Sequence, residues 1–229
     1  MNDLAMRIGA YTERLLKVLN DGWYTLPSVV VSECELKDKV LALCHIITED
    51  TNTTKEVALL ERDIGLQTTY LLSNIMLPEK PEEIIAYLFS LGHEVGIVPE
   101  LIVPLMDENA HPHETMRKLL KPFDKMQVIP TTMMIPSSPF SKHVNVDNEM
   151  FFTEFGEEKT INIEVTTERY LYRSFRAGVH SITEYGMHNI INKVEYANTY
   201  DNQFELIQPE HTGRSLLKLN VSQWEVGVL

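Results

Sequence analysis

The sequence predicts an α+β protein in which a helical N-terminal half is followed by a mostly antiparallel β C-terminal half. Three observations support this fold class. Apolar residues recur with a helical period before about residue 126, a proline- and serine-rich stretch follows, and polar and apolar residues alternate after about residue 150. We therefore expect a helical domain over 1–126, an extended connector over 127–149 and a β-rich domain over 150–229.

The N-terminal half reads as a series of short amphipathic helices separated by caps and turns. Ser32-Glu33-Cys34-Glu35 has the form of a capping box and predicts a helix through Ile47. Pro81 suits the first position of a helix, and Gly92 suits its end. The expected helices cover 3–20, 32–47, 53–64, 67–76, 81–91 and a short segment from Pro99.

The C-terminal half has the period of strands. Thr160 to Val165 alternates polar and apolar residues, as does Trp224 to Val228. Residues 204–207 and 214–221, joined by a turn over 209–213, predict a hairpin. The stretch 180–196 is ambiguous and could be a helix inserted among strands. The three prolines of VIPTTMMIPSSPF, which begins at Val128, indicate an extended connector or an edge strand.

Composition argues against several classes of function. The net charge of the 229 residues is −13, and the acidic excess is shared by both halves. Such a surface repels a phosphate backbone unless a local basic patch overrides it, which argues against nucleic-acid binding. No apolar run approaches the roughly 18 residues of a membrane span, and the N-terminus lacks the pattern of a secretory signal. We expect no membrane association and a cytoplasmic location, or the virion if the chain is viral.

The two cysteines do not predict a disulfide. In the expected 32–47 helix, Cys34 and Cys44 lie ten positions apart, roughly 15 Å along the axis. A disulfide needs Cα atoms within about 7 Å of each other. Two unpaired thiols agree with a reducing compartment.

The stretch DENAHPHE holds the clearest candidate for chemistry. Asp107, His111, His113 and Glu114 are side-chain types that bind zinc or iron, although such a site needs three or four ligands on one ion. A helix start explains the same stretch, with Pro112 at the first helical position and an acidic residue at the positive end of the dipole. The two imidazoles then point in different directions, so we expect neither a metal site nor a cofactor. A metal-dependent hydrolase is the alternative hypothesis.

Residues 59–73 suggest a second alternative, a regulator that acts through a helix-turn-helix unit. The stretch has a helical pattern, a turn with Gly65 and a second helical pattern that opens with small polar residues, over some 15 residues. The expected recognition helix has no Lys or Arg between Gln67 and Lys80, so phosphate contacts would have no cationic donors.

The segment from Arg169 to Arg176 interleaves aromatic residues with arginines. This pattern is typical of platforms for single-stranded nucleic acid, of protein interfaces and of ordinary strands. We expect a protein interface centred on Tyr170, Tyr172, Arg173 and Arg176.

No phosphate-binding loop, dinucleotide fingerprint or nucleophile elbow occurs in the sequence. We therefore expect a non-enzymatic structural or interaction protein with no catalytic residue. It would be a subunit of a homo- or hetero-oligomeric assembly with protein partners, and a bacteriophage virion or its assembly machinery is the specific expectation.

Overall fold

The computed structural model describes residues 3–33, 39–107, 110–141, 146–153, 160–167, 170–178, 180–191, 198–201 and 213–220. The chain forms two compact units. The first comprises 1–72, 76–96 and 193–229, and the second comprises 73–75 and 97–192. Whether 1–126 and 150–229 fold independently stays a prediction, because compactness alone does not measure folding.

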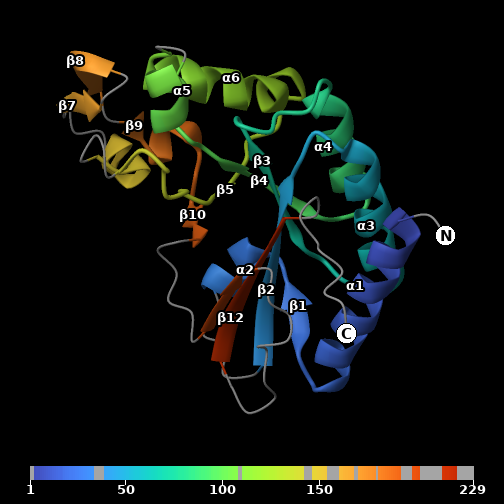
Figure 1. The fold of residues 1–229 in the computed structure, drawn as a ribbon. Helices are drawn as coiled ribbons and strands as arrows, with labels where there is room; N and C mark the ends of the chain where they lie inside the picture. The colour runs from blue at the N-terminus through green and yellow to red at the C-terminus, as the bar shows by residue number, and fades with distance from the viewer. Residues whose placement is uncertain are drawn as a thin grey trace. The chain divides into compact units, whose positions relative to one another are not determined.

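The first unit alternates helices with parallel strands (Figure 1). Its elements are α1 (Asp3–Asn20), β1 (Tyr24–Leu26), α2 (Ser28–Glu33), β2 (Lys39–Ile47), α3 (Thr51–Asp63), β3 (Thr69–Ser73), α4 (Pro81–Ser90), β4 (Glu94–Val98), β11 (Asn198–Asp201) and β12 (Gly213–Asn220). The strand order is β4-β3-β2-β12-β11, and β1 pairs with the first half of β2. The last residues of β3 and β4 belong to the second unit.

This alternation shows that the expected α+β class is wrong. The protein is an α/β protein built on a parallel sheet, rather than a helical half followed by an antiparallel half. β12 pairs in parallel with β2 along its whole length, from Gly213 opposite Lys39 to Asn220 opposite Ile46. The expected hairpin over 204–221 is therefore wrong for its second strand, and 204–207 lie outside the described residues. Trp224 to Val228 also lie outside them.

Residues 39–47 form strand β2 where the capping-box pattern predicts a helix. Lys39–Ile47 is a nearly continuous apolar run, and most of its residues are buried. A strand covered on both faces reads as such a run and not as an alternation, so it is easily mistaken for a buried helix. The same applies to β3, whose five residues are all buried. Cys44 thus lies in a strand, and Cys34 lies outside the described residues.

Helices with clear start and stop signals are confirmed. α1 ends before Gly22, which has a φ of 86°. α4 has Pro81 in its first turn, and Gly92 follows its end with a φ of 85°. The N-cap of α3 is Asp50 rather than Thr53, because the Asp50 carboxylate accepts a hydrogen bond from the Thr53 amide at 3.2 Å.

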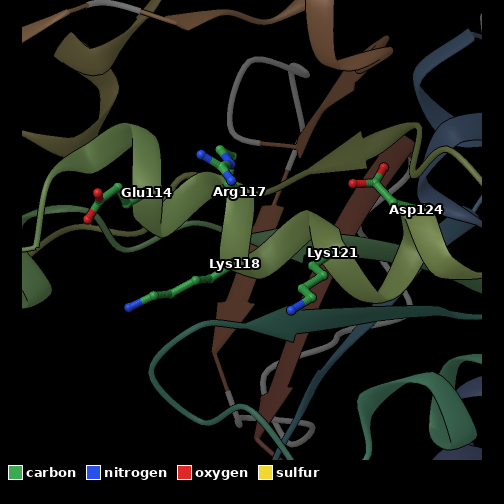
Figure 2. A pocket seen from close by; sticks show the side chains of 5 residues that line it. All are labelled: Glu114, Arg117, Lys118, Lys121 and Asp124. Carbon is green, nitrogen blue, oxygen red and sulfur yellow. The ribbon is translucent and has the colours of Figure 1, made fainter.

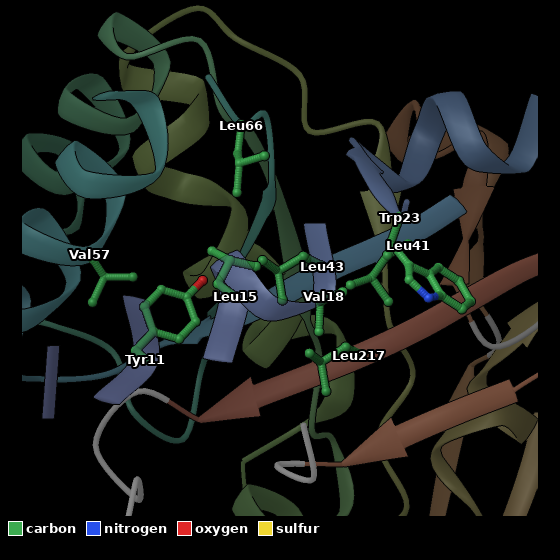
Figure 3. Close-up of a cluster of buried hydrophobic side chains, with 9 residues drawn as sticks. All are labelled: Tyr11, Leu15, Val18, Trp23, Leu41, Leu43, Val57, Leu66 and Leu217. Carbon is green, nitrogen blue, oxygen red and sulfur yellow. The ribbon is translucent and has the colours of Figure 1, made fainter. Parts of the chain in front are cut away.

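The core of the first unit forms where α1 and α3 cover β2 and β12 (Figure 3). Its buried side chains are Tyr11, Leu15, Val18, Trp23, Leu41, Leu43, Val57, Leu66 and Leu217. α2 contacts β2 as well, and α1 and α2 lie to either side of this strand in Figure 1. The sheet is thus covered by helices on both faces, which explains the apolar character of β2.

In its described residues, the second unit contains helices, short strands and a hairpin. Its elements are α5 (Ile102–Asp107), α6 (Pro112–Lys125), β5 (Thr132–Met133), η1 (Asn148–Phe151), β6 (Phe152–Thr153), β7 (Thr160–Thr167), β8 (Tyr170–Gly178), β9 (His180–Ser181), η2 (Thr183–Tyr185) and β10 (Asn189–Ile190). β5 pairs in parallel with β10 and with the end of β4, and β6 pairs in parallel with β9. β7 and β8 form an antiparallel pair of their own.

The proline-rich segment is part of this unit's interior. Met133, Met134 and Ile135 are buried, and β5 belongs to the parallel sheet. The expected strand over 160–165 is confirmed as part of β7. Among the helices of the described residues, none has the length and apolar character that crossing a membrane requires.

Candidate functional site

A buried carboxylate, Glu61 of α3, is the centre of a polar cluster inside the first unit. Its Oε1 atom lies 2.6 Å from Nε2 of His45 and accepts a hydrogen bond from the Tyr11 hydroxyl. Its Oε2 atom accepts hydrogen bonds from the hydroxyls of Thr68 and Tyr70, each at 2.7 Å. The five side chains come from α1, β2, α3, the turn after α3 and β3, and none is more than 2% exposed. This cluster joins four elements through one carboxylate.

The donors around Glu61 keep it ionised. Burial by itself would raise the pKa of Glu61, but the charge of His45 and the hydrogen bonds from His45, Tyr11 and Thr68 lower this pKa to about 2. The same contacts act on the tyrosines in the opposite sense. Burial and then the Glu61 charge raise the pKa of Tyr11 and of Tyr70 well above the usual value. The two phenols therefore stay protonated and serve as donors.

His93 extends the cluster on the side of Thr68. Its Nε2 atom donates to the carbonyl of Ala58 at 2.9 Å, and its Nδ1 atom accepts the Thr68 amide at 3.3 Å. Burial lowers the pKa of His93. A neutral ring with the hydrogen on Nε2 satisfies both contacts.

A second buried carboxylate, Glu100, organises the end of β4 in the second unit. Its Oε1 atom accepts the amides of Ile102 and Val103 at 2.9 and 3.0 Å, at the start of α5. Its Oε2 atom accepts the side-chain amide of Asn148 at 2.7 Å. Asn148 in turn accepts the Leu101 amide at 2.9 Å and donates to the carbonyl of Pro136 at 2.9 Å. Glu100 and Asn148 therefore fix the loop after β4 to the segment after β5.

A third carboxylate, Glu94, also connects several elements by accepting hydrogen bonds. Its Oε2 atom accepts hydrogen bonds from Thr69 at 2.6 Å and Ser28 at 3.0 Å, which hold the start of α2 against β3 and β4. The pKa of the neighbouring Cys44 thiol is raised by burial and next by the Glu94 charge. Cys44 is thus a thiol inside the protein rather than a reactive thiolate.

The DENAHPHE stretch starts α6, and its expected helix start at Pro112 is confirmed. The Nδ1 atom of His111 accepts the amide of His113 at 3.2 Å, so His111 is the N-cap of the helix. Glu114 lies in the first turn. Within the described ranges, no three His, Cys, Asp or Glu side chains are arranged to hold a metal ion. The side chain of Asp107 lies outside the described part.

The exposed face of α6 borders a hollow of about 510 Å³ (Figure 2). Its described lining consists of Glu114, Arg117, Lys118, Lys121 and Asp124. Lys118 and Lys121 extend to one side of the helix and Asp124 to the other. All five side chains are exposed. The face is mixed in charge, with three cations and two carboxylates.

A smaller hollow, of about 180 Å³, lies in the first unit beyond the end of β2. Ligands of parallel α/β proteins commonly bind at this end of the strands. The lining residues are Glu49, Thr51, Lys55, Glu79, Lys80, Glu83 and Ile84. Lys80 and Glu83 already pair with each other at 2.9 Å on an exposed surface, which is a weak interaction.

Residues 59–73 do not form a helix-turn-helix unit. α3 ends at Asp63, Gly65 has a φ of 82°, and Thr69–Ser73 is the buried strand β3 instead of a second helix. The regulator hypothesis therefore loses its expected recognition helix.

Residues 170–176 of the segment from Arg169 to Arg176 lie in strand β8 of the β7–β8 hairpin, and Arg169 lies outside the described residues. Arg173 lies opposite Val165, Arg176 opposite Asn162 and Tyr170 opposite Thr167 in the antiparallel register. The side chains of Tyr170, Tyr172, Arg173 and Arg176 lie outside the described part, so their role in an interface stays a prediction.

The clusters of Glu61 and Glu100 were not predicted. One local signal exists, since Glu61, Thr68 and Tyr70 are polar residues among apolar ones. Buried polar groups need partners, but the sequence does not show which ones they find. No family model matches the chain, and neither a curated protein nor a solved structure matches it.

Proposed function

We propose that the chain is a non-enzymatic protein that acts by binding other proteins, as a subunit of a larger assembly, through the β7–β8 hairpin. The observation that carries this proposal is that β7 and β8 pair with each other in a sheet separate from the parallel sheet. A hairpin of two strands is marginally stable by itself and needs further packing. A partner protein can supply that packing.

The composition of β8 supports the same role. Tyr170, Tyr172, Arg173 and Arg176 belong to the residue types that contribute most to protein interfaces, because they bury a large area and keep a polar tip. Arginines also form strong paired hydrogen bonds with the carboxylates of a partner.

The three carboxylates at the centres of these hydrogen-bond clusters support a non-catalytic role. Glu61 and Glu100 accept hydrogen bonds on both of their carboxylate oxygens, and Glu94 accepts hydrogen bonds that hold the start of α2. Each therefore acts as a structural acceptor in this arrangement. A bacteriophage particle, the specific assembly expected from the sequence, stays a prediction.

The test compares the full chain with a double variant, Tyr172→Ala/Arg173→Ala, by light scattering after size-exclusion chromatography, with and without extract of the cells that produce it. We expect the unaltered chain to elute above its monomer mass. The double variant should keep its circular dichroism spectrum and shift towards the monomer. A matched control, Arg117→Ala/Lys118→Ala on the exposed face of α6, should leave the mass unchanged. Equal masses for the chain and the double variant, or loss of the fold in the double variant, would contradict the proposal.

A further inference from the structure

We propose that the partner of the hairpin is a second copy of this chain, and that the two copies pair in antiparallel fashion along β7 around a two-fold axis at Ile163. This inference rests on the proposed function, that the hairpin binds a protein, and names that protein. It places the contact on β7, and Arg173 of β8 lies opposite Val165 of β7, so Tyr172→Ala/Arg173→Ala disturbs the strand that holds β7 in place. It follows from the difference between the two strands of the hairpin and from the order of residues in β7.

The two strands differ in how their edges are protected. β8 carries Arg173 and Arg176, and among the described elements it contacts α6. β7 has the sequence TINIEVTT, in which Glu164 is the single charged residue and most of the others favour strands. Charged residues protect strand edges from pairing. β7 is therefore the edge that accepts a further strand.

The order of residues in β7 suits pairing with itself. An axis at Ile163 places this residue opposite its own copy and Ile161 opposite Val165 of the second copy. Asn162 then lies opposite Glu164 of the second copy, so an amide meets a carboxylate. Apolar residues thus meet apolar residues on one face, and polar residues meet polar residues on the other.

Other registers are worse. An axis at Glu164 places two carboxylates directly opposite each other, which destabilises a strand pair. A shift by one residue places Ile163 opposite Glu164 and mixes the two faces. An axis at Asn162 shortens the overlap of the two strands. The register centred on Ile163 is the one that joins a long overlap with matched faces and no pair of opposed carboxylates.

The net charge of −13 on each copy opposes association, but this repulsion acts between whole chains and is screened over about 10 Å at 0.1 M salt. Dimerisation through β7 should therefore strengthen as salt is added. An interface made of arginines against carboxylates would weaken instead.

The experiment uses the full chain with Cys34→Ser, in which the remaining cysteine, Cys44, is buried. Directly opposite residues of an antiparallel pair have Cα atoms about 4.5–5.5 Å apart, which is within the range of a disulfide. Ile163→Cys should therefore form a covalent dimer under mild oxidation. Ile161→Cys is the matched control and should crosslink several-fold more slowly, because its opposite residue is Val165. A mixture of Ile161→Cys and Val165→Cys should restore the crosslink.

Two further variants test the same edge without a thiol. Ile163→Lys places two ammonium groups opposite each other and should give monomers in sedimentation equilibrium, whereas Ile163→Thr should stay dimeric. Dimers that persist in Ile163→Lys, or crosslinking at 161 as fast as at 163, would overturn the register. If the thiol introduced by Ile163→Cys is unreactive in a monomer, the chain itself covers this edge, which also overturns the proposal. If no crosslink forms while the native mass still exceeds the monomer and responds to Tyr172→Ala/Arg173→Ala, the β7 interface is wrong and the proposed function stands.

Discussion

The Nε2 atom of His45 lies 2.6 Å from the Oε1 atom of Glu61, and both side chains are fully buried in the first unit. A buried charge is tolerated only where hydrogen bonds replace the lost water. Glu61 meets this condition, since Tyr11, Thr68 and Tyr70 also donate to it. The pair therefore sets how the first unit responds to mutation and to acid.

We expect Glu61→Gln to destabilise the protein by about 3 kcal/mol, because buried donors lose the carboxylate oxygen that accepts their hydrogen bonds. The amide nitrogen cannot accept a hydrogen bond, so the hydroxyls that face it would have to turn from donors into acceptors and give up their present geometry. Urea unfolding followed by circular dichroism measures the change. Glu56→Gln, at an exposed position of the same helix, is the control and should change the free energy of unfolding by less than about 0.5 kcal/mol. Equal effects of the two substitutions would contradict the role of the cluster.

The same carboxylate predicts a loss of stability in acid. The pKa of Glu61 falls from an ordinary 4.5 to about 2 on folding, so the folded state favours the ionised form. This contribution is complete above pH 4.5 and is lost as the pH falls towards 2, with a total on the order of 3 kcal/mol. Urea unfolding at a series of pH values between about 7 and about 3 measures it. The free energy of unfolding of Glu61→Gln should depend less steeply on pH, and identical slopes would refute the assignment.

In the second unit we expect Asn148→Ala to cost roughly 2–4 kcal/mol, because it leaves buried groups without partners. The groups are the Leu101 amide, the Pro136 carbonyl and one oxygen of Glu100. Hydrogen exchange provides a local readout, since the Leu101 amide should lose protection in the variant. Asn52→Ala, at an exposed position of α3, is the control. Unchanged exchange at Leu101 would show that Asn148 does not hold this loop.

At the start of α6, His111 is either an N-cap alone or also a metal ligand, and the two hypotheses predict different effects of substitution. If the ring is only an N-cap, His111→Ala should destabilise the protein by about 1 kcal/mol, and His111→Ser should preserve stability because serine is a good cap. Elemental analysis of the purified protein should find no stoichiometric zinc, manganese or iron. About one metal ion per chain, lost in both variants, would support the hydrolase hypothesis instead.

Several helices could be predicted because their ends have local sequence signals. The parallel sheet could not be predicted, because its strands pair over long distances in the sequence. α1, α4 and α6 have caps, prolines or glycines at their ends, and such signals act within a few residues. β2 and β3 are buried on both faces, so their sequences lack the alternation that identifies a strand. Their parallel partners lie far away in the sequence, where no local pattern points to them.

The buried clusters escaped prediction for a related reason. Tyr11, His45 and Glu61 belong to three different elements, and each residue taken alone has an ordinary sequence context. The contact between these side chains depends on the parallel order of the strands, and the sequence does not predict that order. In contrast, the start of α6 at Pro112 could be predicted from the sequence, because it depends only on neighbouring residues.

The pairing of β12 with β2 has a consequence for protein synthesis. β12 lies beside β2 in the sheet, yet it leaves the ribosome only after every other strand of the described residues has been made. At about 5–20 residues per second, the nascent chain holds one edge of β2 open for on the order of ten seconds. That edge exposes unpaired backbone N–H and C=O groups, which can pair with any strand they meet. Translation therefore exposes this chain to misassembly for longer than it would a protein whose central strand finds its neighbours early, and a chaperone that shields β2 during this interval would raise the yield of native protein.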